Sequence, residues 1–206
     1  MRSEMDWKRT VASIPASSSD RLLRSMGFDL VREYAQVTAA LPDNTKTTLE
    51  LATGTGRMTA VLASWFPSVI TGDISLTDVA RVHQRLPDER WERVQFLQLD
   101  MERLPFRNNS IGTIVCLNTI HETKHPEQCL EEMIRAVRSD GTLIIGDFSR
   151  NGFDVMQRIE QEVYGRDHHE GTMPISKVEE ILRKGFTEIR IIETPLNRTL
   201  SVTGKR

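Results

Sequence analysis

The sequence predicts an α/β domain with a doubly wound, seven-stranded sheet that is mostly parallel, with an antiparallel edge strand and helices on both faces. Strand-like and helix-like segments alternate between residues 46 and 150, which is typical of a parallel sheet covered by helices. A glycine-rich turn, Gly54-Thr55-Gly56, joins the first strand to the next helix. The length of 206 residues suits one domain, 1–206, with a full hydrophobic core.

The first 45 residues are expected to form an N-terminal helical cap on this domain. Residues 1–19 have a mixed composition and end in a serine-rich stretch, which predicts a loop. Apolar residues then recur near the helical period as far as Val37, and Asp20 can cap the helix that they predict. Residues 41–44, Leu-Pro-Asp-Asn, should end this helix.

Residues 46–150 are expected to hold the five parallel strands and the helices between them. The predicted strands are Thr47–Leu51, Val69–Asp73, Val94–Leu99, Ile111–Leu117 and Thr142–Phe148. The predicted helices run from Gly56 to Trp65, from Leu76 to Leu86 and from Pro126 to Val137. Pro87-Asp88 predicts a turn, and Ser139-Asp140-Gly141 predicts another before the last strand.

Residues 151–206 are expected to form a lid on the substrate side and two C-terminal strands. The predicted elements are a helix over Gly152–Tyr164, a polar loop over Gly165–Pro174, a helix ending at Arg183, and strands Glu188–Glu193 and Thr199–Thr203. Ser176 and Glu179 have the spacing of a capping box at the start of the second helix. The short connection between the strands favours a hairpin, which makes one strand antiparallel.

Composition points to a cytoplasmic protein without a nucleic-acid or membrane partner. The 27 basic and 29 acidic residues are interspersed, and no Lys/Arg block predicts a track for a phosphate backbone. No stretch of about 18 apolar residues occurs, and residues 1–19 lack the apolar run of a signal peptide. Cys116 and Cys129 lack metal-ligand spacing, so we expect two core thiols, as fits a reducing cytosol. Exposed edges leave monomer and homodimer open.

Acidic residues end two successive strands next to the glycine turn. Asp73 follows the turn by about the 20 residues that separate a glycine turn from a ribose-binding carboxylate in dinucleotide folds, and Asp100 ends the next strand. Together these residues predict a nucleoside ligand. No Gly-Lys-Ser/Thr follows, and no third glycine completes the dinucleotide pattern. An adenosine carrying an amino-acid tail therefore fits better than a nucleotide phosphate.

Several motifs in order resemble those of class I S-adenosylmethionine-dependent methyltransferases, which have a Rossmann-like fold. Residues 49–57, Leu-Glu-Leu-Ala-Thr-Gly-Thr-Gly-Arg, resemble the first motif, with Ala52 in the position of the first glycine. Residues 69–75 resemble the second motif, and residues 100–110, from the aspartate through Leu-Pro-Phe to Asn-Ser, the third. The resemblance is to the ubiquinone/menaquinone-biosynthesis type and extends over about residues 49–148.

The resemblance implies that the 46–150 core binds S-adenosylmethionine, with S-adenosylhomocysteine as product. It assigns the methionine part of the cofactor to Glu50, Ala52, Thr53, Gly54 and Gly56. It further assigns the ribose to Asp73, the adenine to Ile74, Asp100 and Met101, and the border between cofactor and substrate to Asn118.

A sulfonium methyl group is already activated, so transfer by in-line displacement depends mainly on positioning. A base is required only if the acceptor must lose a proton. The candidates are His121, after the fourth strand, and Tyr164, His168 or His169 in the late segment. A core-edge role for His121 and a solvated loop for the histidine pair are the alternatives. No metal site is expected, because the pair would need a third ligand such as Asp167 or Glu170.

A small-molecule acceptor is favoured because the chain adds only a short helical segment and a late loop to the core. Methylation of RNA or protein is the alternative within the same enzyme class. A cofactor-binding protein without catalysis and a nicotinamide dehydrogenase are further alternatives, because the fold alone does not determine function.

Overall fold

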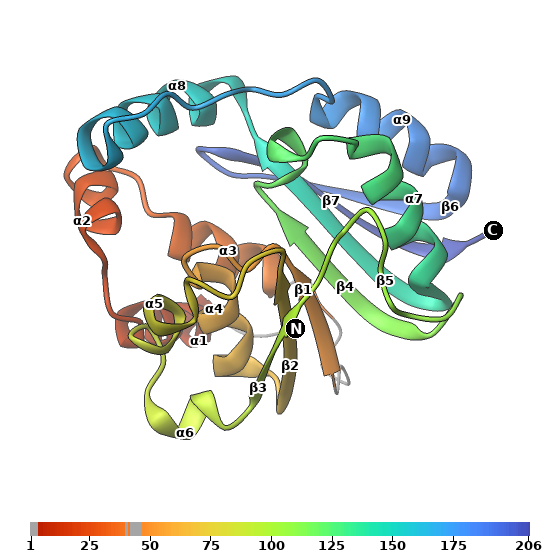
Figure 1. Ribbon diagram of the computed structural model, residues 1–206, viewed down its shortest axis with the longest axis horizontal. Helices are drawn as coiled ribbons and strands as arrows, with labels where there is room; N and C mark the ends of the chain where they lie inside the picture. The colour runs from red at the N-terminus through yellow and green to blue at the C-terminus, as the bar shows by residue number, and fades with distance from the viewer. Residues whose placement is uncertain (1–3, 40, 42–46) are drawn as a thin grey trace.

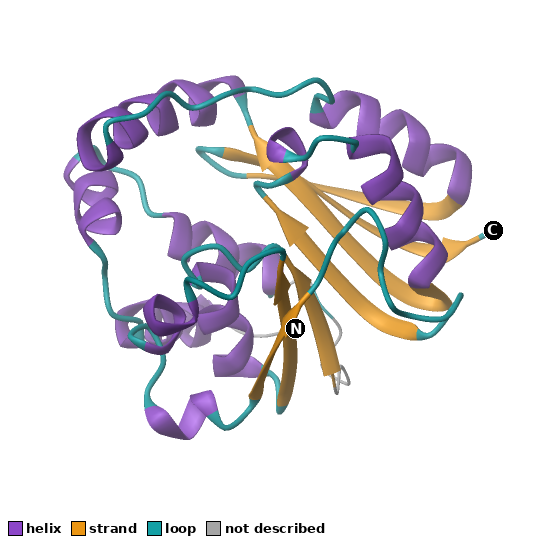
Figure 2. Cartoon of the chain, viewed as in Figure 1, coloured by secondary structure: helices purple, strands orange, loops and turns teal. Residues whose placement is uncertain are grey.

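The computed structural model describes residues 4–39, 41 and 47–206, with side chains described from residue 8 onward. Its centre is a seven-stranded sheet in the order β3-β2-β1-β4-β5-β7-β6, drawn in orange in Figure 2. The strands are β1 (Thr47–Leu51), β2 (Ser68–Asp73), β3 (Val94–Gln98), β4 (Ile111–Leu117), β5 (Val137–Phe148), β6 (Phe186–Glu193) and β7 (Asn197–Lys205). The chain turns back at β1, so the carboxyl ends of β1 and β4 flank the point where the strand order reverses.

The strand directions confirm the predicted fold class. Strands β1 to β5 pair in parallel, whereas β7 pairs antiparallel with both β5 and β6. The antiparallel strand β7 therefore lies one place in from β6 at this edge of the sheet. The β6–β7 connection is the predicted hairpin, and the backbone N–H of Thr194 donates to the Asn197 carbonyl within it, at 2.9 Å.

Two apolar cores lie on opposite faces of the sheet. On β4, Val115 and Leu117 pack with the helices of the N-terminal half, while Ile114 and Cys116 pack with α7 and α9 on the other face. Strands buried on both faces need continuous apolar sequence, which explains the runs that predicted them. Figure 1 shows α3 and α4 on one side of the sheet and α7 and α9 on the other.

The helices are α1 (Glu4–Ser13), α2 (Ser18–Ser25), α3 (Leu30–Thr38), α4 (Arg57–Trp65), α5 (Val79–His83), α6 (Asp88–Trp91), α7 (Pro126–Ala136), α8 (Arg150–Ile159) and α9 (Ile175–Gly185). A 3-10 turn, η1 (Ile120–Glu122), follows β4, and a π-helical turn, η2 (Glu160–Tyr164), extends α8. No helix in the described part of the chain combines the length and apolarity needed to cross a membrane.

The N-terminal segment differs from the prediction. Residues 4–13 form α1 rather than a loop, and the predicted long helix is two helices. Ser17 caps α2 in a capping box with Asp20, so Asp20 lies inside the first turn instead of at the cap. Gly27, with a φ of 87°, ends this helix, and Asp29 caps α3. The apolar period continues across the break and so conceals it. The predicted stop at residues 42–44 lies outside the described residues.

Other boundaries also shift. The helix predicted over residues 76–86 is shortened to α5, and α6 forms where a turn was expected. β5 begins at Val137, before the predicted turn, and its pairing with β4 shifts register between Ile111 and Thr113. Helix α9 starts after Pro174 without a side-chain cap, so the Ser176 capping box was wrong. Proline fixes φ and lacks the N–H that such a box would satisfy.

Candidate active site

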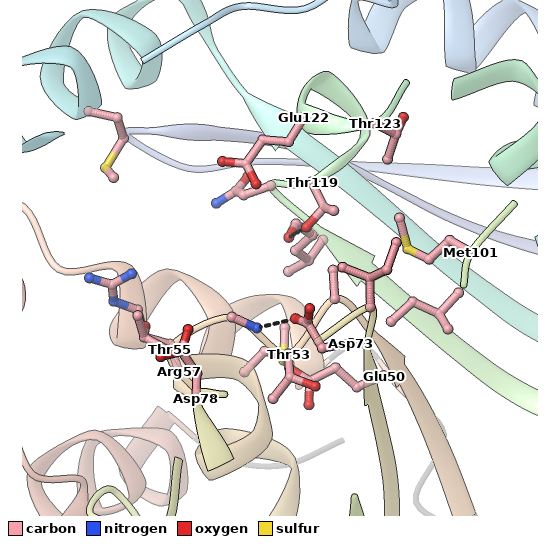
Figure 3. A pocket seen from close by; sticks show the side chains of 18 of the residues that line it. Glu50, Thr53, Thr55, Arg57, Asp73, Asp78, Met101, Thr119, Glu122 and Thr123 are labelled. Carbon is pink, nitrogen blue, oxygen red and sulfur yellow. Dashed lines mark hydrogen bonds between the residues drawn. The ribbon is translucent and has the colours of Figure 1, made fainter. Parts of the chain in front are cut away.

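A cavity of about 960 Å³ opens at the carboxyl ends of β1, β2, β3 and β4. Figure 3 shows Glu50, Thr53 and Asp73 grouped at the strand ends, with Thr119 and Glu122 across the cavity. Of the residues assigned to the cofactor, those that line the cavity are Glu50, Ala52, Thr53, Gly54, Asp73, Ile74, Asp100, Met101 and Asn118. The structure thus brings together side chains from four strand ends, whereas Gly56 lies behind the wall.

The turn after β1 has left-handed backbone at three positions. Ala52, Gly54 and Gly56 have φ values of 60°, 50° and 78°. A Cβ on Gly56 would lie 2.8 Å from Cγ1 of Val82, so only glycine lets α4 begin this close to α5. Gly56 therefore shapes the turn instead of lining the cavity. Ala52 adopts a conformation that a glycine would adopt without strain.

Glu50 is a buried carboxyl at the base of the cavity. Its Oε2 accepts hydrogen bonds from the hydroxyls of Thr59, at 2.6 Å, and Thr71, at 2.7 Å. Burial raises the pKa of Glu50 to about 7, against the opposing effect of these hydrogen bonds. An arriving cation would favour the ionised form of this group.

Asp73 and Asp100 present carboxylates at the ends of adjacent strands. Asp73 Oδ2 accepts from the backbone N–H of Gly54 at 2.9 Å, and Oδ1 accepts from that of Ser75 at 3.3 Å. Asp100 accepts from the backbone N–H of Glu102 at 2.9 Å. A carboxylate has about four acceptor sites, so both groups keep acceptor capacity for ligand hydroxyl or amino groups. Beside Asp73, the side chain of Ile74 is 69% exposed on the cavity wall.

Asn118 follows β4 with a φ of 55°. Its Nδ2 donates to the hydroxyl of Tyr34 at 2.9 Å, while its buried Oδ1 finds no hydrogen-bond partner within the described residues. A buried acceptor without a donor is destabilising, so this amide oxygen suits a donor supplied by a ligand. Tyr34, from α3, joins the N-terminal segment to the cavity wall, a role that its apolar helical position did not reveal.

A buried ion-pair network that the sequence did not predict supports the glycine turn. Asp20 of α2 accepts from Nε of Arg57 and from Nη1 of Arg85, each at 2.6 Å. Arg85 also donates to the carbonyl of Thr55 in the turn, at 2.6 Å. Burial would raise the pKa of Asp20, but the two guanidinium charges outweigh it and hold the pKa below its ordinary value.

Of the four base candidates, His169 is exposed outside the cavity lining, and the other three occupy different places at the far side of the cavity. Tyr164 and His168 line it, whereas His121 is buried behind them. His121 Nδ1 lies 2.6 Å from Oδ1 of Asp147, on β5. Burial lowers the pKa of His168, and the adjacent His121 adds to this effect. Glu122, which the sequence analysis did not select, also lines the cavity. The sequence signal that could have identified Glu122 is its position next to His121 in the segment that follows β4.

The predicted core role of the two cysteines agrees with their burial. Cys116 and Cys129 are free thiols, both buried. Burial raises the pKa of Cys129 to about 11 and that of Cys116 further still. The raised pKa values favour the protonated form of both thiols at neutral pH.

Residues 49–145 match the family described as "Methyltransferase domain". The chain is 29% identical over 154 residues to a demethylmenaquinone methyltransferase of Clavibacter sepedonicus, covering 69% of this chain and 61% of that protein. It is 31% identical over 141 residues to a demethylmenaquinone methyltransferase of Porphyromonas gingivalis, covering 66% of this chain and 58% of that protein. The chain thus spans about three fifths of the length of these relatives.

Solved structures share the fold at low sequence identity. A SAM-dependent methyltransferase from Thermotoga maritima superposes with a TM-score of 0.63 at 20% identity, covering 98% of this chain and 99% of that one. An S-adenosylmethionine-dependent methyltransferase from Mesorhizobium loti gives a TM-score of 0.61 at 14% identity, covering 84% and 97%. These likenesses show the fold alone.

The residues present fit a nucleoside that carries a cationic amino-acid tail. Carboxyl groups of Glu50, Asp73 and Asp100 surround the glycine turn, and the acceptor of Asn118 lacks a protein donor. The matched segment, the strand order and the positions of these groups all agree with a methyltransferase domain. Over residues 49–145 the chain is therefore similar to methyltransferase domains, and its strand order is that of the similar solved structures.

Proposed function

We propose that this chain transfers the methyl group of S-adenosylmethionine to a small-molecule acceptor bound in the same cavity. The observation that carries the proposal is the two-sided cavity, with carboxylates at the strand ends and a separate polar wall opposite. The cofactor supplies a methyl group on a sulfonium, which is already activated for transfer. The protein therefore has to bind and orient two partners and exclude water.

The strand-end side of the cavity provides the cofactor contacts in this proposal. Asp73 accepts from the ribose hydroxyls, and Asp100 accepts from the adenine amino group. Ile74 and Met101 cover the adenine faces, and their apolar side chains line the cavity beside the two carboxylates. Glu50 and the glycine turn hold the amino-acid tail, with Glu50 ionising toward the ammonium group.

The opposite side provides the acceptor contacts. Its polar groups are Thr119, Glu122, Tyr164 and His168, and its apolar groups include Phe148 and Met156. This mixture suits a flat, partly hydroxylated ring. The names of the relatives support a quinone-type acceptor, because both similar proteins described above are demethylmenaquinone methyltransferases.

Proton removal from such an acceptor falls to the groups that reach the cavity. His168 and Tyr164 line it directly, whereas His121 lies behind them and can act only through a neighbour. The direct role therefore falls to Tyr164 or His168, and metal binding by His168, proposed below, would leave it to Tyr164.

The test is transfer of labelled methyl from S-adenosylmethionine to a reduced, ring-unsubstituted naphthoquinone, with total RNA and a protein extract as competing acceptors. Label in the quinol, lost in Asp73→Ala, is the expected result. Label only in RNA or protein would refute the small-molecule assignment. Cofactor binding without label in any acceptor would favour the non-catalytic alternative.

A further inference from the structure

Three potential metal ligands meet at the rear of the cavity, away from the strand-end side to which the proposed function assigns the cofactor. They are His121, Glu122 and His168, here called the His–Glu cluster, and one ligand atom from each lies within 4.8 Å of the others. His121 and Glu122 come from η1, and His168 comes from the loop after η2. The sequence analysis expected no metal site, because the histidine pair would need a third ligand such as Asp167 or Glu170. The structure instead brings His168 beside two residues of η1 that lie 46 and 47 positions earlier in the chain.

Both imidazoles of the cluster have a nitrogen without a hydrogen-bond partner among the described residues, although Nε2 of His121 lies 3.8 Å from Oε1 of Glu122. The Nε2 atoms of His121 and His168 are buried and form no hydrogen bond with any described residue. The side chain of His121 is 1% exposed. Leaving a buried polar atom without a hydrogen bond is destabilising, and here two such atoms lie in one cluster. An absent ligand that binds both nitrogens would account for them together.

A second carboxylate orients the His121 ring. Asp147 lies 2.6 Å from Nδ1 of His121 through Oδ1, and its Oδ2 accepts from the backbone N–H of His121 at 3.2 Å. With the proton on Nδ1, the lone pair on Nε2 is free and directed away from Asp147. A carboxylate behind a histidine fixes ring and tautomer in this way at metal centres.

The loop that carries His168 is held against η1. Gly171 has a φ of 69°, and a Cβ at this position would lie 2.2 Å from the carbonyl oxygen of His121. Only glycine permits so close an approach. The backbone N–H of His168 donates to Oε1 of Gln157 on α8, at 2.7 Å. The ring packs against His121, Phe148 and Phe153 at centroid distances of 5.0–5.8 Å.

We propose that His121, Glu122 and His168 bind a divalent transition metal of the Zn²⁺ class. Two imidazole nitrogens and one carboxylate form a three-ligand set typical of metal sites that keep an open position. Glu122 and His168 line the cavity, so the open position faces the acceptor. An oxygen of the acceptor would bind there, a role that rests on the proposed function, whereas metal binding does not.

A histidine base paired with Asp147 is the competing explanation. It accounts for the Nδ1 contact of His121 but not for the second unpartnered nitrogen, on His168, or for the adjacent carboxylate of Glu122. The two explanations make different predictions. Only the metal site predicts that the protein binds a metal ion tightly when neither cofactor nor acceptor is present.

The experiment titrates chelator-treated protein with Co²⁺ alone, followed by visible absorption, and with Zn²⁺ alone, followed by calorimetry. We expect one site per chain and Co²⁺ ligand-field bands in the wild type. His168→Gln and Glu122→Gln should each weaken binding more than tenfold, because outer ligands alone already change metal affinity 10–100-fold. His169→Gln is the matched control, since His169 is the exposed neighbour in the same loop, and it should bind like the wild type.

Circular dichroism checks that each variant folds. Because two ligand residues are replaced separately, the test still works if one variant does not fold. Equal Co²⁺ spectra in wild type, His168→Gln and Glu122→Gln would overturn the metal site, as would the absence of binding in the wild type. A parallel titration with S-adenosylhomocysteine separates the claims. Cofactor binding without metal binding refutes only the metal site, and metal binding without cofactor binding refutes only the proposed methyl transfer.

Discussion

The backbone N–H of Gly54 donates a 2.9 Å hydrogen bond to Oδ2 of Asp73, which ties the turn after β1 to the end of β2 (Figure 3). Parallel strands end at the same edge of a sheet. The contact therefore joins the ends of two neighbouring strands, although Gly54 and Asp73 are 19 positions apart in sequence. It holds the carboxylate in place before any ligand arrives. Preorganisation of this kind reduces the entropy lost on binding.

Replacing Asp73 with alanine should weaken binding of S-adenosylhomocysteine by on the order of 2–4 kcal/mol, through the loss of one or two charge-assisted hydrogen bonds. Calorimetric titration measures this change. Asp88→Ala is the control, because the Asp88 side chain is 97% exposed on α6 and should leave affinity unchanged. Unaltered affinity in folded Asp73→Ala would mean that the ribose contact is elsewhere.

The raised pKa of Glu50 predicts a pH-dependent stability. Its pKa is about 7 in the folded chain and about 4.5 when exposed, so the folded state binds more protons between these values. The free energy of unfolding contributed by this group therefore falls as pH rises from 4.5 through 7. Glu50→Gln removes this slope and should unfold at higher denaturant concentration than the wild type at pH 8, but not at pH 5. Parallel pH profiles for both proteins would contradict the prediction.

Ala52→Gly should stabilise the protein. A left-handed conformation costs a non-glycine residue about 1–2 kcal/mol, and the greater freedom of glycine in the unfolded chain offsets part of the gain. We expect a net gain of about 0.5–1 kcal/mol, seen as a melting temperature higher by roughly 1–4 °C. Ala60→Gly, inside helix α4 and fully buried, is the comparison and should lower the melting temperature.

Asp20→Ala should be strongly destabilising because it leaves Arg57 and Arg85 without their shared partner. Removing one member of a buried ion pair costs about 3–5 kcal/mol. Asp29→Ala, which breaks the more exposed pair with Arg24 and removes the α3 cap, should cost only about 1–2 kcal/mol. Urea denaturation compares the two variants. An Asp20→Ala loss no larger than that of Asp29→Ala would show that the network does not support the turn.

The strand-end residues could be predicted because short-range pattern and topology determine their positions. Asp73, Asp100 and Asn118 each follow an apolar run, and the parallel sheet then brings the ends of these runs together. The same reasoning fails where the chain bends locally. Gly27 divides one apolar period into two helices, and no feature of the period itself records the break.

Contacts between segments far apart in the sequence could not be predicted from the sequence pattern either. Asp20 meets Arg85 across 65 positions, and only the packing of α2 beside the glycine turn brings the two charges together. His168, for which a solvated loop was the alternative, is half-buried because Gly171 lets its loop approach η1. His121 was a base candidate with a core-edge role as the alternative, and the turn of η1 directs its ring to Asp147 while Glu122 lines the cavity wall.

The most direct test of the account is calorimetric titration of the purified chain with S-adenosylhomocysteine and, separately, with NADH. We predict binding of S-adenosylhomocysteine with one site per chain, lost in Asp73→Ala, and no binding of NADH, because the glycine turn lacks the third glycine of dinucleotide folds. Binding of NADH alone, or of neither ligand, would contradict the assignment of this cavity to a methyl donor.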